Sequence, residues 1–260
     1  VRRQRAMTGQ LEISEDAFLG GRLRLRQPMS GHRAGHDAVL LAAATPARPR
    51  DRVVDFGAGV GAAGLAVATR AAGVDLLMVE REESLANLAR ANADLNGIAA
   101  QVCILDIAAE ANAFAAAGLN PDSVDVVLMN PPFNDPARHR SSPDDVRRAA
   151  HMAEPATLET WIHAARRVLK SGGVLSLIWR GDALAEVLSA LERGFGGVAI
   201  RPVHPDAGKP AIRVLVRAIK GSRAPLQLCP GLMLNDESGQ PTQEAQDILA
   251  GVRVIALPGV

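Results

Sequence analysis

Short, almost wholly apolar segments alternate with longer amphipathic segments along the middle of the chain. Continuous apolar character is typical of strands that are buried on both faces, as in a parallel sheet covered by helices. Helices are predicted between the strands, at Ala62–Ala72, Glu82–Leu95, Ile107–Ala117, Leu158–Leu169 and Ala183–Arg193. The predicted strands are Arg52–Phe56, Leu76–Glu80, Val102–Asp106, Val124–Asn130, Val174–Trp179, Val198–Val203 and Ile212–Ala218. This pattern predicts an α/β fold with an open, doubly wound parallel sheet, Rossmann-like and seven-stranded, that is covered by helices.

The segments on either side of this alternation predict a basic extension and a small tail. Gly21–Gln27 alternates Arg with Leu, so Arg22, Arg24 and Arg26 share one face of a short predicted strand. We expect an extension over residues 1–50, a core domain over residues 51–220 and a tail over residues 221–260 packed on the same domain. Further predicted elements are a helix at His36–Ala44, a β segment at Leu226–Asn235 broken at Pro230-Gly231, and a helix at Thr242–Ala250.

The net charge of +1 conceals an uneven distribution. Residues 1–36 carry seven Arg against three acids, residues 51–133 four Arg against eleven acids, and residues 201–223 six Lys or Arg against one Asp. One explanation is that these charges only solvate the surface. The other is an acidic pocket for a cationic small molecule between basic flanks that bind a polyanion.

Membrane insertion, secretion and metal binding are not predicted. No apolar run reaches the roughly 18–20 residues that cross a bilayer, and the basic start has no apolar stretch behind it. Cys103 and Cys229 lie far apart in apolar contexts, which favours buried free thiols in a reducing cytoplasm. The six histidines lack the spacing of a zinc site.

The first predicted strand runs through a glycine-rich turn, DFGAGVG at residues 55–61, into a helix. Such a turn brings backbone amides at a helix N-terminus close to a ligand, and a dinucleotide is one candidate. Asp55, placed before the first glycine, would repel a pyrophosphate and favour a cation such as the ammonium and sulfonium of S-adenosylmethionine. Glu80 and Asp106 end the next two predicted strands, where they can accept from ribose hydroxyls and from an adenine amino group. Each carboxylate alone is also explained as a solvated strand end, and Asp106 as a helix cap.

The fourth predicted strand ends in Asn130-Pro131-Pro132-Phe133. The first and fourth strands of such a sheet are expected to be neighbours, which places this motif beside the methyl group of the cofactor. A planar amine is a poor nucleophile because its lone pair is delocalised. The Asn130 side-chain oxygen and the Pro131 carbonyl would accept from its two N–H bonds, the prolines would stiffen that carbonyl, and Phe133 would stack on the ring. The alternative is a Pro-Pro loop anchored in the core by Phe133.

Together these motifs resemble the class I S-adenosylmethionine-dependent amino-methyltransferases, whose members modify adenine N6, guanine N2 or glutamine N5. Three segments are similar to the bacterial tRNA(Val) adenine-N6 methyltransferase family, which acts next to the anticodon: FLGGRLRLRQPMSGHRAGHDAVLL, WIHAARRVLKSGGVLSLIWR and PLQLCPGLMLNDESGQPTQEAQDILAG. The resemblance implies that the target adenine is held by Asn130, Pro131, Pro132 and Phe133, where Phe replaces a frequent Tyr. It implies a cofactor site formed by Arg33, Asp37, Asp55, Phe56, Gly57, Ala58, Gly59, Glu80, Arg81, Asp106 and Ile107. Arg33 and Asp37 are equally explained as fixing the N-terminal segment to the sheet.

A tRNA substrate is expected from this resemblance and from the basic segments. Arg22, Arg24 and Arg26 would follow a phosphate path, and Arg138, His139 and Arg140 follow the NPPF motif directly. The isoelectric point near 8.1 is only mildly basic. Alternatives are an rRNA adenine or guanine, a protein glutamine, and a non-catalytic RNA-binding module. Glutamine methyltransferases usually carry a separate helical N-terminal domain, for which the fifty or so residues before the first predicted strand are too few.

Overall fold

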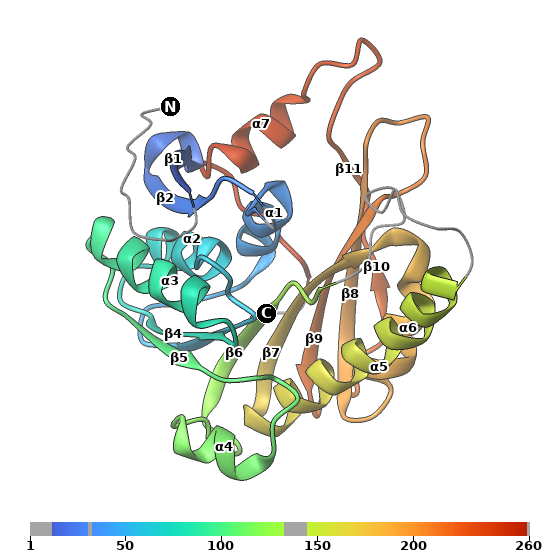
Figure 1. Ribbon diagram of the computed structural model, residues 1–260. Coiled ribbons are helices and arrows are strands. Elements are labelled where there is room, and N and C mark those ends of the chain that lie inside the picture. Colours follow the sequence, from blue (N-terminus) through green and yellow to red (C-terminus); the bar gives the residue numbers. More distant parts are fainter. Residues whose placement is uncertain (1–11, 31–32, 133–144, 259–260) are drawn as a thin grey trace.

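The computed structural model describes residues 12–30, 33–132 and 145–258, with side chains in helix α5 from residue 157 onward. Its centre is a nine-stranded sheet in the order β10-β8-β9-β7-β6-β3-β4-β5, with β11 also paired to β8 (Figure 1). The strands are β3 (Arg52–Phe56), β4 (Asp75–Glu80), β5 (Ala100–Ile104), β6 (Val124–Met129), β7 (Leu169–Arg180), β8 (Phe195–His204), β9 (Arg213–Lys220), β10 (Gln227–Leu228) and β11 (Leu232–Met233).

All seven predicted strands form, and the predicted Rossmann-like α/β architecture is confirmed. The sheet is mostly parallel and departs from the predicted parallel arrangement at β9, which runs antiparallel to both β7 and β8. The connection over residues 205–212 is too short for a parallel crossover, which needs about a dozen residues or more. The third predicted strand also ends early, at Ile104, so Asp106 lies beyond the strand and does not close it.

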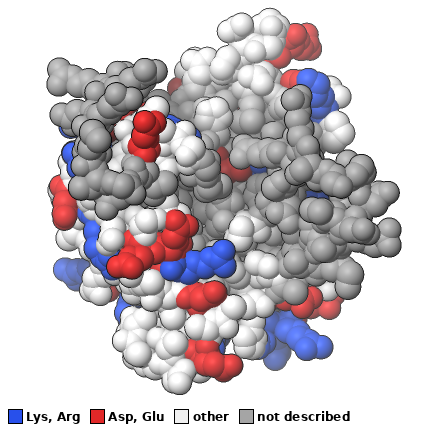
Figure 2. All heavy atoms as spheres, in the orientation of Figure 1, with Lys and Arg blue, Asp and Glu red and all other residues white. Residues whose placement is uncertain are grey.

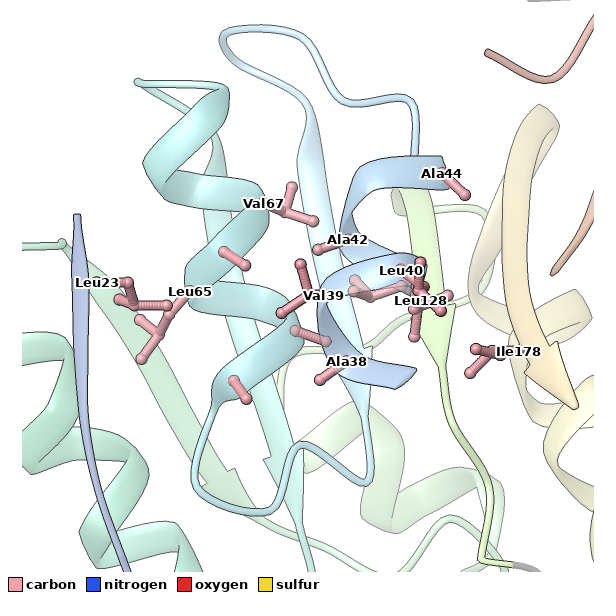
Figure 3. Close-up of a cluster of buried hydrophobic side chains, with 14 of the residues drawn as sticks. Leu23, Ala38, Val39, Leu40, Ala42, Ala44, Leu65, Val67, Leu128 and Ile178 are labelled. Atoms are coloured by element: carbon pink, nitrogen blue, oxygen red, sulfur yellow. The ribbon is translucent and has the colours of Figure 1, made fainter. Parts of the chain in front are cut away.

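Helices cover both faces of the sheet (Figure 1). One face carries α1 (His36–Ala44), α2 (Ala62–Arg70) and α3 (Glu83–Leu95), and the other carries α4 (Ala111–Ala116), α5 (Asp145–Val168) and α6 (Leu184–Leu191). Each face of the sheet packs against its helices in a separate hydrophobic core, and successive strand residues point into the two cores alternately. Val126 and Leu128 point into the first core, with α1, α2 and α3, and Val127 and Met129 into the second. Figure 3 shows Leu40 of α1 beside Leu128 of β6, with α1 lying between α2 and Ile178 in the first core.

The N-terminal extension forms a hairpin in which β1 (Ile13–Phe18) pairs antiparallel with β2 (Leu23–Pro28), and β1 was not predicted. Asn92 of α3 and Asn96, the residue that ends this helix, bind the backbone of β2 along its outer edge. Asn96 accepts from the Arg24 N–H at 2.9 Å and donates to the Arg24 carbonyl at 2.7 Å. Asn92 does the same at Arg26, at 2.7 and 2.9 Å. These amides satisfy the edge of β2 as a neighbouring strand would.

The C-terminal tail adds β10 and β11 to β8 and then forms α7 (Gln243–Leu249). The predicted break at Pro230-Gly231 is confirmed, since it separates the two short strands. The predicted helix is also confirmed, and the Thr242 hydroxyl caps it by accepting from the Ala245 N–H at 3.1 Å. Beyond α7, the Ile255 N–H donates to the Ala43 carbonyl at 2.9 Å, which holds the tail against α1.

Candidate functional site

The glycine-rich turn lies at the carboxyl end of β3, between the ends of β4 and β6. Gly57, Gly59 and Gly61 all have a positive φ, at 68°, 57° and 88°, which a residue with a Cβ adopts only with strain. The Ala58 N–H donates to the Val79 carbonyl at 2.9 Å, so the turn bends toward β4. Open space adjoins the turn at Gly59, where a Cβ would meet no atom within 4 Å.

Asp55 is buried at the end of β3, with 3% of its surface exposed. The Gly64 N–H, in the first turn of α2, donates to Asp55 Oδ2 at 2.8 Å. Burial raises the pKa of Asp55 to about 7; the Gly64 hydrogen bond opposes this shift, and the nearby Glu80 adds to it. A cation at this carboxyl group would favour its charged form.

Glu80 ends β4 with both carboxylate oxygens bound to backbone amides. The Gly59 N–H donates to Oε2 at 2.8 Å, and the Glu82 N–H donates to Oε1 at 2.8 Å. The side chain is 7% exposed and therefore held in one orientation by these two bonds. Each oxygen keeps a second lone pair for a ligand hydroxyl, which is the geometry that a ribose diol requires.

The other cofactor candidates differ in how they face the site. Asp106 is exposed, and its Oδ1 accepts from the Ala108 N–H at 2.8 Å, so in this state it stabilises the turn that follows β5. Arg81 is exposed beside Glu80. Phe56 and Ile107 are buried in the second core, Phe56 edge-on against Phe114 with ring centroids 6.1 Å apart. Since those two side chains point into the core, they can offer a ligand only their backbone.

Asn130 follows β6 directly, and its amide oxygen is buried without a hydrogen-bond donor in the described part of the chain. Met129 pairs in register with Phe56, so the next residues along the two strands, Asn130 and Gly57, are neighbours at the sheet edge. Pro131 is buried and Pro132 is exposed. Phe133 lies outside the described residues. An unpartnered buried acceptor beside the glycine-rich turn is costly unless a ligand supplies the donor.

Arg33 and Asp37 both make contacts within the chain. Arg33 donates to Asp16 Oδ2 at 2.6 Å and to the Pro28 carbonyl at 2.9 Å. Asp37, in the first turn of α1, accepts from Arg213 Nε at 2.9 Å. These bonds tie the N-terminal segment to the hairpin and to β9, and a place for Arg33 and Asp37 in the cofactor site stays a prediction.

The basic residues proposed to bind RNA are distributed differently from the sequence expectation. Arg24 and Arg26 lie on one face of β2 but share Glu15, with Arg24 Nε at 2.9 Å and Arg26 Nε at 3.3 Å from its carboxylate. Arg22 precedes the strand and donates to the Ala250 carbonyl at 2.8 Å. Arg138, His139 and Arg140 lie outside the described residues. On the described part of the face in Figure 2, basic and acidic side chains likewise lie side by side.

Three residues near the site were not identified from the sequence. Asn92 and Asn96 hold the hairpin, and the Asn92 amide also donates to the Val60 carbonyl of the glycine-rich turn at 2.9 Å. Trp161 of α5 lies against Gly57. A buried Asn inside an amphipathic helix was the available signal for Asn92, whereas no local pattern pairs Trp161 with a glycine so distant in sequence.

Neither a metal site nor a membrane span is found in the part of the chain that the structure describes. No three His, Cys, Asp or Glu side chains there are grouped so as to share a metal ion. No helix there is both long and apolar enough to cross a bilayer. Cys103 and Cys229 are free and partly buried.

Comparisons with known proteins point to one family. A family model described as the methyltransferase small domain matches residues 30–202. The tRNA1(Val) (adenine(37)-N6)-methyltransferase of Erwinia tasmaniensis is 28% identical over 186 residues, which cover 71% of this chain and 74% of that protein. The release factor glutamine methyltransferase of Chlorobaculum tepidum is 27% identical over 154 residues, so the match spans 57% of this chain and about half (52%) of that relative.

A solved structure resembles most of the chain. It is the crystal structure of a predicted O-methyltransferase from Agrobacterium tumefaciens, 34% identical, with a TM-score of 0.72. The match covers 86% of this chain and all (100%) of that one.

Proposed function

Because the chain belongs to the methyltransferase small-domain family and is a class I methyltransferase with S-adenosyl-L-methionine as its cofactor, we propose that it methylates N6 of an adenine in tRNA. The proposed target is an adenine in the anticodon loop, in the cytoplasm. The observation that supports a planar amine as the acceptor is the buried, unpartnered amide oxygen of Asn130 beside the glycine-rich turn. The name of the Erwinia relative supports tRNA as the acceptor.

The described residues fit the cofactor. The bound cofactor supplies an electrophilic methyl group on a positively charged sulfur. Asp55 would accept from the cationic amino-acid portion, and Glu80, fixed by two backbone amides, would accept from the ribose hydroxyls. The positive-φ glycines bring the backbone of the turn close to the ligand. Asp106 would leave its turn contact or use its second oxygen to bind the adenine amino group.

The Asn130 oxygen would activate the acceptor by orientation and electrostatics. Asn130 Oδ1 would accept a hydrogen bond from the target amine and so orient the nitrogen lone pair for transfer, and the Pro131 carbonyl would accept the second N–H. The proton that leaves the amine passes to solvent, because an amide oxygen is not a base. A hydroxyl acceptor would instead need a base at this position, so the site favours nitrogen over oxygen.

Glutamine of a protein substrate is the second candidate, favoured by the match to the Chlorobaculum enzyme. Its side-chain amide is also planar, and Asn130 would accept from it in the same way. The two candidates require the same geometry at Asn130 and differ in what surrounds the acceptor.

Methyl transfer from labelled cofactor to total tRNA, compared with transfer to a protein extract from the same cells, tests the proposal. We expect label in tRNA, and mass spectrometry of its digested nucleosides should identify N6-methyladenosine. Label found only in protein would replace the tRNA proposal with the glutamine candidate. Label on a ribose hydroxyl would show that the site methylates oxygen.

A further inference from the structure

The first glycine of the turn is in contact with a tryptophan from another part of the chain. A Cβ built on Gly57 would stand 2.3 Å from Cη2 of Trp161, 2.9 Å from Cζ3 and 3.5 Å from Cζ2. The edge of the indole six-membered ring therefore lies directly on the Gly57 backbone. Two independent constraints require glycine at position 57: its φ of 68° is strained for other residues, and any Cβ would collide with the Trp161 ring.

Trp161 lies against the cofactor turn at Gly57, the glycine whose position follows the Phe56–Met129 pair of β3 and β6. It belongs to α5, the first helix after the Asn130 motif in the sequence, and it packs partly buried against the second core. Ile162, the next residue, is 2% exposed and anchors the helix to the sheet. Because Gly57 and Asn130 follow paired positions of β3 and β6, the ring supports the turn at its point nearest to Asn130.

We propose that Trp161 is a positioning residue for methyl transfer, which acts through the Gly57 backbone. The ring prevents the turn from moving toward α5, so the cofactor is held at a fixed distance from Asn130. A glycine without this support samples more conformations, and a displacement of about 1 Å at a reacting centre costs about 100-fold in rate. The inference rests on the cofactor site and not on which acceptor is methylated.

A double-mutant cycle on cofactor binding tests the contact. Gly57→Ala alone should weaken S-adenosylmethionine binding strongly, because its methyl group collides with the ring. Trp161→Leu removes the ring, so the double variant should bind about tenfold more tightly than Gly57→Ala alone. Strictly additive effects would overturn the proposal. This arm uses the cofactor alone, and so its result is independent of the tRNA proposal.

The rate of methyl transfer to total tRNA tests the positioning role. At saturating cofactor and tRNA we expect Trp161→Leu to lower kcat at least about tenfold, with most of the rate restored in Trp161→Phe, whose ring keeps a flat support. Trp179→Phe is the matched control, since Trp179 is fully buried in β7: its melting temperature should fall while kcat stays near wild type. An unchanged kcat in Trp161→Leu, or an equal loss in the Phe variant, would overturn the proposal.

Intrinsic fluorescence gives a readout that does not need turnover. Trp161 is the partly exposed one of the two tryptophans. Cofactor bound at the Gly57 turn should therefore change its emission in Trp179→Phe, and leave the emission of Trp161→Phe unchanged. The reverse result would place the cofactor away from Trp161 and overturn the proposal.

Discussion

At the scale of single residues, Asp55 combines burial with a function that needs charge. Its carboxyl group is 3% exposed and has a pKa of about 7 against an ordinary value of 3.8. At about 1.4 kcal/mol per pKa unit, keeping it charged in the ligand-free protein costs about 4 kcal/mol. A cationic ligand offsets this cost, so cofactor binding and ionisation of Asp55 are coupled.

This coupling predicts a pH-dependent stability of the ligand-free protein. The folded state keeps the Asp55 proton up to about pH 7, whereas the unfolded chain releases it near the ordinary value of 3.8. The stabilisation from this group is thus complete below about pH 4 and is lost as the pH rises through 7. Asp55→Asn removes the titration. The melting temperature of the variant minus that of wild type should therefore increase as the pH rises from 5 to 8, measured by differential scanning fluorimetry.

The same variant should bind the cofactor more weakly at pH 8, because the neutral amide cannot pair with a cation. Isothermal titration of S-adenosylmethionine into both proteins measures this loss, for which we expect about 100-fold. Equal affinity at pH 8 would remove Asp55 from the cofactor site, and parallel melting curves from pH 5 to 8 would contradict the raised pKa.

Substitution of Asn130 should lower methyl transfer without lowering the stability of the fold. Its amide oxygen is buried without a donor in the described structure, so Asn130→Leu removes an unsatisfied acceptor at similar volume. We expect turnover to fall at least about 100-fold, while the free energy of unfolding stays level or rises by about 1 kcal/mol. Activity assays and urea denaturation measure the two effects.

Cofactor affinity distinguishes the roles that Asn130 can have. Asn130→Ala should leave the dissociation constant of S-adenosylmethionine nearly unchanged, because the amide serves the acceptor base. If affinity and activity collapsed together, Asn130 would hold the turn and not the substrate.

At the scale of elements, the hairpin depends on side-chain amides rather than on a third strand. Asn92 bonds to both backbone groups of Arg26 and to the Val60 carbonyl, and it is fully buried. Asn96 bonds to both backbone groups of Arg24 and is partly exposed. Removing either amide leaves backbone groups of β2 without partners, and Asn92 also connects the hairpin to the glycine-rich turn.

We therefore expect Asn92→Ala to lower the free energy of unfolding by about 3 kcal/mol and Asn96→Ala by about 1 kcal/mol. Hydrogen exchange should accelerate over residues 13–28 in both variants, and over the turn near Val60 only in the first. Asn87→Ala is the matched control, because that exposed amide in the same helix binds only Arg90. If Asn92→Ala and Asn96→Ala exchanged at the same rates as Asn87→Ala, the hairpin would be stable without these two amides.

The sequence predicted the elements that carry a local signal and failed where long-range pairing decides. The apolar runs of three strands correctly placed Asp55, Glu80 and Asn130 at the carboxyl ends of β3, β4 and β6. The direction of β9 depends on loop length, and β1 is too polar, as ISEDAF, to be recognised without its partner β2. Asp106 was placed at a strand end because Leu105 extends the apolar run, although pairing with β4 ends at Ile104.

At the scale of the whole molecule, basic side chains lie in two separate places, one on the β1–β2 hairpin and one around a pocket near the start of β7. One is the face of β2, which Asn92 connects to the glycine-rich turn near Asn130. The other surrounds a pocket of about 500 Å³ lined by His163, Arg166, Arg167, Ser171, Gly194, Lys220 and Gly221, at the amino end of β7. RNA whose base reaches Asn130 is expected to follow the first surface.

The shared carboxylate of Glu15 makes this expectation testable in both directions. Arg24 and Arg26 both pair with Glu15, so their attraction for phosphate is partly cancelled. Glu15→Gln frees both guanidinium groups and should tighten tRNA binding, whereas the double variant Arg24→Gln/Arg26→Gln should weaken it. Filter binding across a salt series should show the slope of log K against log salt falling by about 1–2 in the double variant.

Lys170→Gln is the matched control, because Lys170 forms a comparable exposed pair with Asp125 but directly precedes Ser171, which lines the pocket. Its salt slope should equal that of the wild type if RNA crosses the β2 face. A reduced slope in Lys170→Gln, with the arginine variant unchanged, would move the RNA path to the pocket. Since the pocket lies near the start of β7, whereas Asn130 follows the end of the parallel strand β6, such a result would also require the RNA to wrap around the sheet to reach the methyl group.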